Sequence, residues 1–179
     1  MRVGVLHPGE MGATVLESLI ANGVSATWVK EGRRERTIQR AGSVPSLDTL
    51  EELTDSVETI ISVCPPSAAL EVALNIFDKG FKGIYVDANA ISPLESRKIS
   101  ELFGAAFVDG GIIGPPAKEA GTTRIYLSGM RSREVVDLFE FGPLEAIALS
   151  DSSDPEEITA ASALKMAYAG FSKGSSALL

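Results

Sequence analysis

Short apolar runs alternate with amphipathic helical stretches along most of the chain. The runs predict strands at residues 3–6, 26–29, 58–63, 83–87, 106–109, 124–128 and 144–148. The segments between them predict helices at residues 9–21, 33–41, 47–53, 68–77, 92–102 and 132–139. Strands that alternate with helices are typical of right-handed crossovers between parallel strands. We therefore expect an α/β fold with a doubly wound, mostly parallel sheet and helices on both faces.

The last segment of the chain has a different pattern. Asp154-Pro155-Glu156-Glu157 predicts a helix start, with Asp as N-cap, Pro at the first helical position and a Glu that reaches back. From Ile158 to Leu179 there is no proline, and no stop signal ends the pattern. We predict one domain at residues 1–153 and a long helix at residues 154–179, which we expect to lead into a helical C-terminal domain absent from this sequence.

Composition and charge exclude several classes of function. The chain has 179 residues, 45% of them apolar, and 24 acidic against 16 basic residues give a net charge of -8. An acidic surface argues against nucleic-acid binding, which needs a basic face. A single histidine and a single cysteine, Cys64, argue against a His/Cys metal site and exclude an intramolecular disulfide. No apolar run reaches membrane length, so we expect a soluble, cytoplasmic protein.

The first predicted strand runs directly into the segment His7-Pro8-Gly9-Glu10-Met11-Gly12, and a helix follows. A glycine-containing strand-to-helix turn at this place is typical of a Rossmann-type domain, where the backbone approaches a pyrophosphate at the helix N-terminus. His7 stands where the first glycine of that motif belongs. The segment predicts a dinucleotide site, with His7 as a turn residue that touches the cofactor; the alternative is that the glycines serve backbone packing alone.

The end of the second strand bears on the choice of cofactor. It reads Lys30-Glu31-Gly32-Arg33-Arg34, and four arginines fall within residues 33–40 of an otherwise acidic chain. A guanidinium grips phosphate oxygens in bidentate fashion, which suits the 2′-phosphate of NADP. We favour NADP on this basis, with contacts from Lys30, Glu31, Arg33 and Arg34. Two alternatives stay open: a solvated helix face, or Glu31 as the ribose acceptor of an NAD enzyme.

Four segments taken in order resemble one family. They are Gly9-Glu10-Met11-Gly12, Ser62-Val63-Cys64-Pro65-Pro66, Val108-Asp109-Gly110-Gly111-Ile112-Ile113-Gly114 and Ala163-Leu164-Lys165-Met166-Ala167-Tyr168. Their order and spacing resemble the β-hydroxyacid dehydrogenases, related to 3-hydroxyisobutyrate and 6-phosphogluconate dehydrogenases. The resemblance spans essentially the whole chain, and the particular residues of the last two segments suggest a separate branch of that superfamily.

The resemblance implies hydride transfer between NAD(P) and a small hydroxy acid or related carbonyl compound. It places Cys64-Pro65-Pro66 along the nicotinamide side of the cofactor and Asn89 near the nicotinamide ribose. It also assigns substrate binding to the loop that contains Gly110, Gly111, Ile112, Ile113 and Gly114, and catalysis to Lys165.

The sequence departs from the family pattern on the substrate side. Ile113 replaces a serine, Ala169 replaces an asparagine one turn beyond the lysine, and Thr159 and Ala161 replace small glycines. An isoleucine side chain cannot hydrogen-bond a carboxylate, so a simple 3-hydroxy acid is a poorer expectation than the family name suggests. An imine reductase and a non-catalytic nucleotide-binding module are the alternatives.

Lys165 also stands out on its chemistry alone. Residues 158–169 are mostly apolar or small, and one lysine interrupts them. Desolvation lowers the pKa of a lysine and brings it toward the range of proton exchange with an alcohol or carbonyl. The alternative is a lysine that extends its amine into water. Tyr168 is either a second proton donor or, as we favour, a packing residue.

One side of the final helix is apolar and carries Leu164, Ala167, Phe171 and Leu178. Exposed apolar patches tend to acquire partners, so we expect self-association through this helix and a homodimer.

Overall fold

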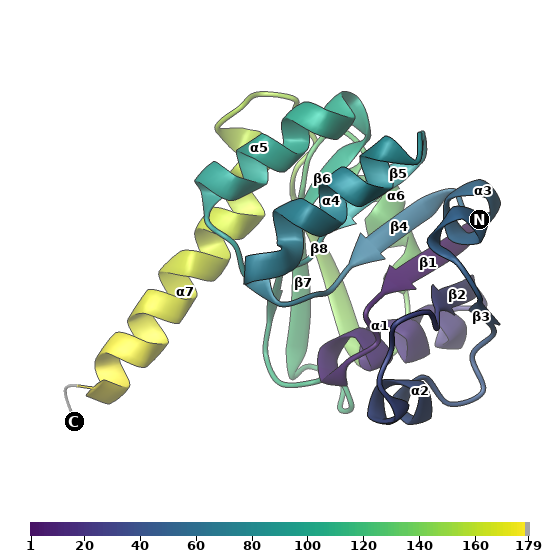
Figure 1. Cartoon of the computed structure of the whole chain (residues 1–179). Coiled ribbons are helices and arrows are strands. Elements are labelled where there is room, and N and C mark those ends of the chain that lie inside the picture. The colour runs from purple at the N-terminus through teal and green to yellow at the C-terminus, as the bar shows by residue number, and fades with distance from the viewer. Residues whose placement is uncertain (178–179) are drawn as a thin grey trace.

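The described residues form one eight-stranded sheet with helices on both faces (Figure 1). The computed structural model describes the backbone of residues 1–177 and the side chains of residues 1–172. The strands are β1 (Arg2–Leu6), β2 (Ser25–Val29), β3 (Ser46–Leu47), β4 (Thr59–Ser62), β5 (Ile84–Asp87), β6 (Phe107–Ile113), β7 (Thr123–Ser128) and β8 (Leu144–Ser150). The helices are α1 (Glu10–Ala21), α2 (Glu35–Ala41), α3 (Leu50–Ser56), α4 (Ala69–Asp78), α5 (Pro93–Phe103), α6 (Ser132–Val136) and α7 (Ala160–Ala177).

The sheet has the order β3-β2-β1-β4-β5-β6-β7-β8. Within the described chain β6 pairs with β7 in antiparallel fashion, and the other six neighbouring pairs are parallel. The strand order reverses direction at β1, because β2 and β3 lie on one side of it and β4 lies on the other. The topological switch point of the sheet is therefore between β1 and β4. The predicted Rossmann-type, doubly wound and mostly parallel sheet is confirmed.

Each face of the sheet has its own apolar core. On one face α1 buries Val15, Leu16 and Leu19 against β1 and β2, and on the other α4 buries Ala73 and Ile76. Val15 and Leu19 are fully buried, and Met11 packs at the edge of this core. The two cores hold the strand ends rigidly, and these ends position the candidate site.

The helix predicted at residues 47–53 is wrong at its start. Leu47 lies in β3 and pairs with Val29, and the helix begins only at Leu50. Thr49 sets the boundary: its hydroxyl accepts from the backbone N–H of Glu52 at 3.2 Å, and the Glu52 carboxylate accepts from the Thr49 backbone N–H. This capping box starts the helix at Leu50, so only two residues separate it from β3. The second helix also starts late, at Glu35, with Arg34 as its N-cap.

The strand predicted at residues 106–109 is too short. β6 continues to Ile113, so the expected substrate loop from Gly110 to Ile113 is a strand paired with β7. The glycines do not end the strand, because they are required where other backbone segments approach it. A Cβ at Gly110 would lie 3.0 Å from the Asp87 carbonyl oxygen, and one at Gly111 would lie 2.7 Å from that of Ala161.

The C-terminal helix begins later than predicted and is fixed to the sheet by its first turn. The Asp154 carboxylate accepts from the Glu156 N–H at 2.8 Å, but Glu157 does not reach back and instead accepts from Ser150 Oγ. A 3₁₀ turn, η4 (Glu157–Thr159), precedes α7. Figure 1 shows α7 leaving the sheet and extending well beyond it. The boundary predicted at residues 153/154 stays a prediction, and Leu178 and Leu179 lie outside the described residues.

Side chains of the sheet cap the first N–H groups of α7. The Ser162 N–H donates to Asp109 Oδ2 at 2.6 Å, and the Ala161 N–H donates to Ser128 Oγ at 3.1 Å. Asp109 also accepts from the hydroxyls of Ser162 and Ser96, so one buried carboxylate ties α5, β6 and α7 together. A carboxylate at a helix N-terminus is favourably placed with respect to the helix dipole.

Candidate functional site

The turn between β1 and α1 has the backbone geometry of a glycine-rich turn although it begins with histidine. His7 has φ 61°, in the left-handed region that glycine enters most readily and that histidine tolerates better than most residues. At the other end of the turn, a Cβ on Gly12 would lie 2.5 Å from the His7 carbonyl oxygen. Gly12 therefore allows the helix to start directly against the strand, which is the role of the third glycine in a dinucleotide-binding turn.

A cavity of about 300 Å³ opens at this turn, at the carboxyl ends of β1 and β4. Its lining comes from the turn, the start of α2 and the loop after β4, and comprises His7, Gly9, Glu10, Met11, Gly12, Arg33, Thr37, Val63, Cys64 and Pro65. Ligands of open α/β sheets bind at such a switch point. No side chain of the described residues caps the N-terminus of α1, whose N-cap is Gly9. The α1 dipole therefore presents its positive end to the cavity.

Two cavity-lining side chains have buried polar atoms that lack a hydrogen-bond partner within the described chain, His7 Nδ1 and Arg33 Nε. Burial, followed by the nearby Arg33 charge, lowers the pKa of His7 to about 4. His7 is therefore a neutral imidazole at pH 7. Burial also lowers the pKa of Arg33, because the cavity wall desolvates its guanidinium. An anionic ligand would partner both groups.

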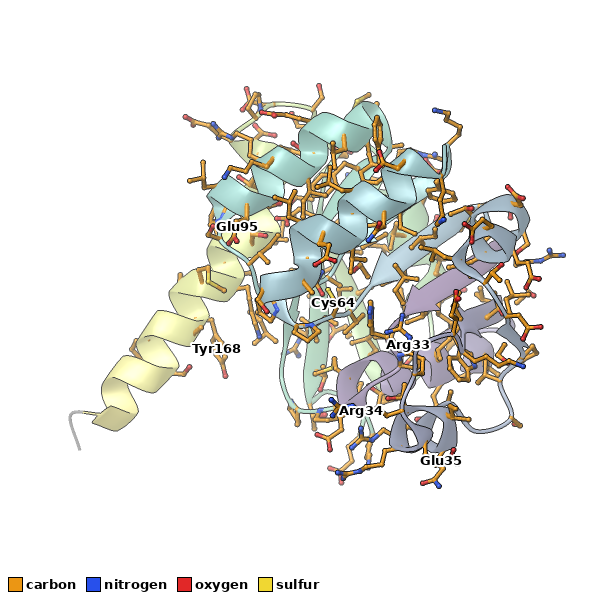
Figure 2. The ribbon with its side chains drawn as sticks, in the orientation of Figure 1. Arg33, Arg34, Glu35, Cys64, Glu95 and Tyr168 are labelled. Carbon is orange, nitrogen blue, oxygen red and sulfur yellow. The ribbon has the colours of Figure 1, made fainter. Side chains whose placement is uncertain are left out.

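The structure separates the residues predicted to read the adenosine end of the cofactor. Arg33 is half-buried in the cavity wall, whereas Arg34 is exposed; Figure 2 shows Arg33 nearer to Cys64 than Arg34 is. Lys30 forms an ion pair with Asp48 at 2.7 Å, and this hydrogen bond and charge raise the pKa of Lys30. Glu31 is exposed. Lys30, Glu31 and Arg34 thus stand outside the cavity lining, and their roles stay predictions.

The loop after β4 lines the opposite wall of the cavity. Cys64 and Pro65 belong to the lining, while Pro66 begins the next 3₁₀ turn, η1 (Pro66–Ala68). Pro8, in the turn between β1 and α1, is buried and is not part of the cavity lining. Burial raises the pKa of Cys64, so its sulfur is a thiol at neutral pH and a weak nucleophile.

Asn89 supports this loop from behind. It is 3% exposed, and its Oδ1 accepts from the Cys64 backbone N–H at 2.6 Å. Its Nδ2 donates to Ser62 Oγ at 3.2 Å and to Asp87 Oδ2 at 3.0 Å. The amide that the resemblance places at the nicotinamide ribose is engaged with the protein, and its contact with a cofactor stays a prediction.

The residues predicted to bind substrate lie on β6 and the turn that follows it. Gly110 packs against Ala88, Gly111 lies under α7, and Ile112 is 5% exposed. Ile113 is half-buried, and Gly114 has φ 131° where a Cβ would meet the backbone of Thr122. These glycines have packing roles, and residues 109–113 pair with β7, so most of the predicted substrate loop is a strand.

Lys165 lies on the side of α7 that packs on β6. Its Nζ donates to the Ile112 carbonyl oxygen at 2.6 Å, and its Cβ would lie 3.2 Å from a Cβ on Gly111. The amine is therefore held at the strand that the resemblance assigns to the substrate. Tyr168, one turn further along α7, is 47% exposed, so it packs less than expected (Figure 2).

Sequence reasoning missed Thr37, Val63 and Asp87. Thr37 lies in the first turn of α2, whereas Arg33 precedes the N-cap of that helix, so helical spacing gave no signal for their common place in the cavity lining. Val63 directly precedes Cys64. No sequence pattern marked Asp87 as part of the site, because its role depends on its hydrogen bonds with Asn89 and on contacts with the neighbouring strands. Within the described residues, no group of three or more His, Cys, Asp or Glu side chains could hold a metal, and no helix is long and apolar enough to cross a membrane.

Two proteins are similar to this chain over its whole length. A protein of Methanothermus fervidus, described as an uncharacterized 28.5 kDa protein in the 7S RNA 5′ region, is 31% identical over 183 residues, which cover 100% of this chain and 68% of that protein. The conserved protein MTH1747, of unknown function, has a solved structure reported to resemble 3-hydroxyacid dehydrogenases; it is 32% identical with a TM-score of 0.82, over 99% of this chain and 67% of that one. The chain belongs to their family.

The structural similarity of MTH1747 to 3-hydroxyacid dehydrogenases agrees with the resemblance that the four sequence segments indicated. A 3-hydroxyisobutyrate dehydrogenase of Mycobacterium tuberculosis has a TM-score of 0.70 at 15% identity, over 89% of this chain and 57% of that one. A reductive aminase of Aspergillus terreus, solved with NADPH, has a TM-score of 0.75 at 16% identity, over 98% of this chain and 62% of that one. The last two matches establish the shared fold. No family model matches the chain.

Proposed function

We propose that this family member binds NADP(H) and takes part in hydride transfer to or from a small hydroxy acid or related carbonyl compound. The observation that supports this best is the cavity at the switch point, where the glycine turn, the Cys64 loop and Arg33 converge. The relatives support the same class, because MTH1747 resembles 3-hydroxyacid dehydrogenases and the reductive aminase was solved with NADPH.

The residues present fit a dinucleotide. Gly12 leaves room where a Cβ would strike the His7 carbonyl, and the N-terminus of α1 offers N–H groups to a pyrophosphate. His7 Nδ1 and Arg33 Nε are buried polar atoms at the cavity that a ligand would satisfy. Arg33 is the residue best placed for a 2′-phosphate, and Cys64 and Pro65 form the wall for the nicotinamide half.

When bound, the cofactor donates or accepts the hydride. The chain's own contribution to the chemistry is proton transfer by Lys165. In the direction of reduction, negative charge develops on the substrate oxygen, and the ammonium group stabilises this charge and donates the proton. Its hydrogen bond to the Ile112 carbonyl oxygen orients the amine at β6.

The cofactor assignment is tested by a matched pair of variants, Arg33→Ala and Arg34→Ala, in NADPH and NADH titrations followed by nicotinamide fluorescence. We expect Arg33→Ala to weaken NADPH binding by up to about 1.5–3 kcal/mol, the value of a charged hydrogen bond, and to change NADH binding little. Arg34→Ala is the control, since Arg34 is exposed and outside the cavity lining. Equal losses for NADPH and NADH in Arg33→Ala would contradict the preference for NADP.

The catalytic assignment is tested with Lys165→Met, which keeps the apolar stem and removes the charge and the proton. NADPH affinity should be unchanged, while oxidation of NADPH with a panel of small carbonyl compounds should fall about 10²–10⁴-fold, the usual contribution of a general acid. If the wild-type chain binds NADPH and turns over none of them, the non-catalytic nucleotide-binding alternative is favoured. If Lys165→Met keeps wild-type turnover, the assignment of proton transfer to Lys165 is wrong. Turnover of preformed imines alone would favour the imine reductase alternative.

A further inference from the structure

A buried polar cluster lies behind the Cys64 loop, at the carboxyl ends of β4 and β5. Asp87 is fully buried, and both of its oxygens accept from Asn89: Oδ1 from the backbone N–H and Oδ2 from the side-chain amide, each at 3.0 Å. Asn89 in turn accepts from the Cys64 backbone N–H at 2.6 Å. Three hydrogen bonds therefore connect a carboxylate with no solvent exposure to a residue that lines the cavity.

The Asp87 carboxylate determines which way the Asn89 amide faces. With an acceptor at Asp87 Oδ2, the NH₂ group of Asn89 turns toward Asp87 and Ser62, and its oxygen turns toward the Cys64 N–H. The reversed amide would bring an oxygen against the carboxylate and an NH₂ group against the Cys64 N–H. Both reversed contacts lack a hydrogen bond, so the charged form of Asp87 allows one orientation alone.

We propose that Asp87 and Asn89 are positioning residues for the cofactor cavity: the Asp87 carboxylate orients Asn89, and Asn89 fixes the Cys64 loop in the position that lines the cavity. This inference rests on the proposed function for its effect on cofactor binding, and on the hydrogen bonds alone for its effect on the loop.

The arrangement has a consequence at neutral pH. Burial raises the pKa of Asp87 to about 7, against the opposing effect of its hydrogen bonds from Asn89. The charges that face it act in the same direction as burial: Asp109 from β6 and Glu95 from α5. Its neighbours on the side of β4 are Ser62 and Cys64, and Tyr85 is its neighbour on β5. Burial raises the pKa of Cys64 and the pKa of Tyr85, so both side chains are neutral in this pH range.

Protonation of Asp87 weakens the control of the loop. The carboxyl group then has no charge, and the oxygen that carries the proton is a weaker acceptor, so the hydrogen bonds from Asn89 are weakened. Ser62 Oγ still accepts from the amide, and for this reason the loop loosens without being released. One hydrogen bond of ordinary strength corresponds to about a threefold to tenfold change of affinity, which is the upper limit of this effect.

The first experiment uses the unmodified chain and Asp87→Asn without any ligand. The ¹⁵N–¹H NMR signal of Cys64 is followed from about pH 5.5 to about pH 8.5, because this amide donates the hydrogen bond to Asn89. We expect one inflection near pH 7, the value set by Asp87. A Cys64 signal that is the same in the wild-type chain and in Asp87→Asn at every pH would overturn the positioning pair, whether or not a cofactor binds.

The second experiment measures NADPH and NADH affinity over the same pH range in Asp87→Asn. The wild-type chain should bind both cofactors more tightly above the inflection than below it, by at most about threefold to tenfold. NADH is the necessary second probe, because a phosphate monoester titrates near pH 6 and NADH has no 2′-phosphate. Asp87→Asn has no titrating carboxyl, so we expect the weaker affinity throughout and no inflection with NADH.

The matched control is Asp109→Asn, an equally buried aspartate on the neighbouring strand that hydrogen-bonds Ser96 and Ser162 in place of Asn89. It should keep the NADH inflection but move it to lower pH, because Asp109 contributes to the raised pKa of Asp87. An inflection that persists unchanged in Asp87→Asn contradicts the proposal. If neither cofactor binds at any pH, the proposed function is wrong, and the Cys64 signal still decides the positioning pair.

Discussion

Two glycines of the first turn make different demands on the structure, and an alanine at each position separates them. A Cβ at Gly12 would lie 2.5 Å from the His7 carbonyl oxygen and 3.3 Å from its carbonyl carbon. A Cβ at Gly9 meets only the same oxygen, at 3.9 Å, and Gly9 has φ -70°, which any residue adopts. Gly12→Ala therefore forces backbone atoms apart, whereas Gly9→Ala fits the folded chain as it stands.

The magnitudes follow from these contacts. Overpacking of a close-packed site costs about 1–3 kcal/mol, and at Gly12 the obstructing atoms are backbone, which cannot rotate away. Gly9→Ala replaces one N-cap residue with a poorer one, which costs about 0.5–1 kcal/mol. Gly9 lines the cavity, however, so its added methyl group takes up space where a pyrophosphate would approach α1. We expect Gly12→Ala to lower the free energy of unfolding more than Gly9→Ala does. Relative to its loss of stability, Gly9→Ala should lose more NADPH affinity than Gly12→Ala.

Urea unfolding, followed by Trp28 fluorescence, measures the first quantity, and NADPH titration of the folded variants measures the second. Trp28 is 2% exposed in the core beside this turn, so its emission reports loss of the sheet. Unchanged NADPH affinity in Gly9→Ala would mean that the glycines serve packing alone, and that the cavity is not a pyrophosphate site.

Two further predictions concern stability and assembly. Because the pKa of buried Asp87 is raised to about 7 from 3.8, the folded chain holds this proton more tightly than the unfolded chain. Its contribution to stability is therefore greatest at low pH and is lost as the pH rises to 7; from pH 5 to pH 8 the stability of Asp87→Asn should rise by about 2 kcal/mol relative to wild type in urea unfolding. On α7, Leu164 is 37% and Phe171 76% exposed, so light scattering should show self-association that Phe171→Ser weakens. A strict monomer at high concentration would count against the homodimer.

The fold could be predicted because its signals are local. Periodicity and the order of the strands identified the doubly wound sheet, and the errors fall where tertiary contacts override local pattern. The pair Gly110-Gly111 predicts the end of a strand, yet β6 continues through both residues. Glycine is required there because Ala88 and α7 approach too closely for a side chain. The start of α7 reads as a regular capping box, yet the sheet supplies the caps through Ser128 and Asp109.

The candidate site was predictable in outline and not in detail. The glycine turn, Cys64 and the arginine cluster were identified from spacing, and the structure gathers several of them around one cavity. Arg33 and Arg34 are chemically identical neighbours, and only the path of the chain into α2 makes one a wall residue and the other exposed. Asp87 and Asn89 form a pair through contacts with the next strand, which no local pattern encodes.

The two interpretations of Lys165 differ in what they require of β6. A lysine that extends its amine into water needs only an exposed helix face, and nothing in that interpretation requires a glycine beneath it. Here α7 lies so close to β6 that a Cβ at Gly111 would be 2.7 Å from the Ala161 carbonyl oxygen and 3.2 Å from Lys165 Cβ. Asp109 fixes the first turn of α7 through Ser162, one turn before Lys165. Close packing and a cap together hold the amine at the Ile112 carbonyl oxygen, and a fixed amine is what the proposed proton transfer requires.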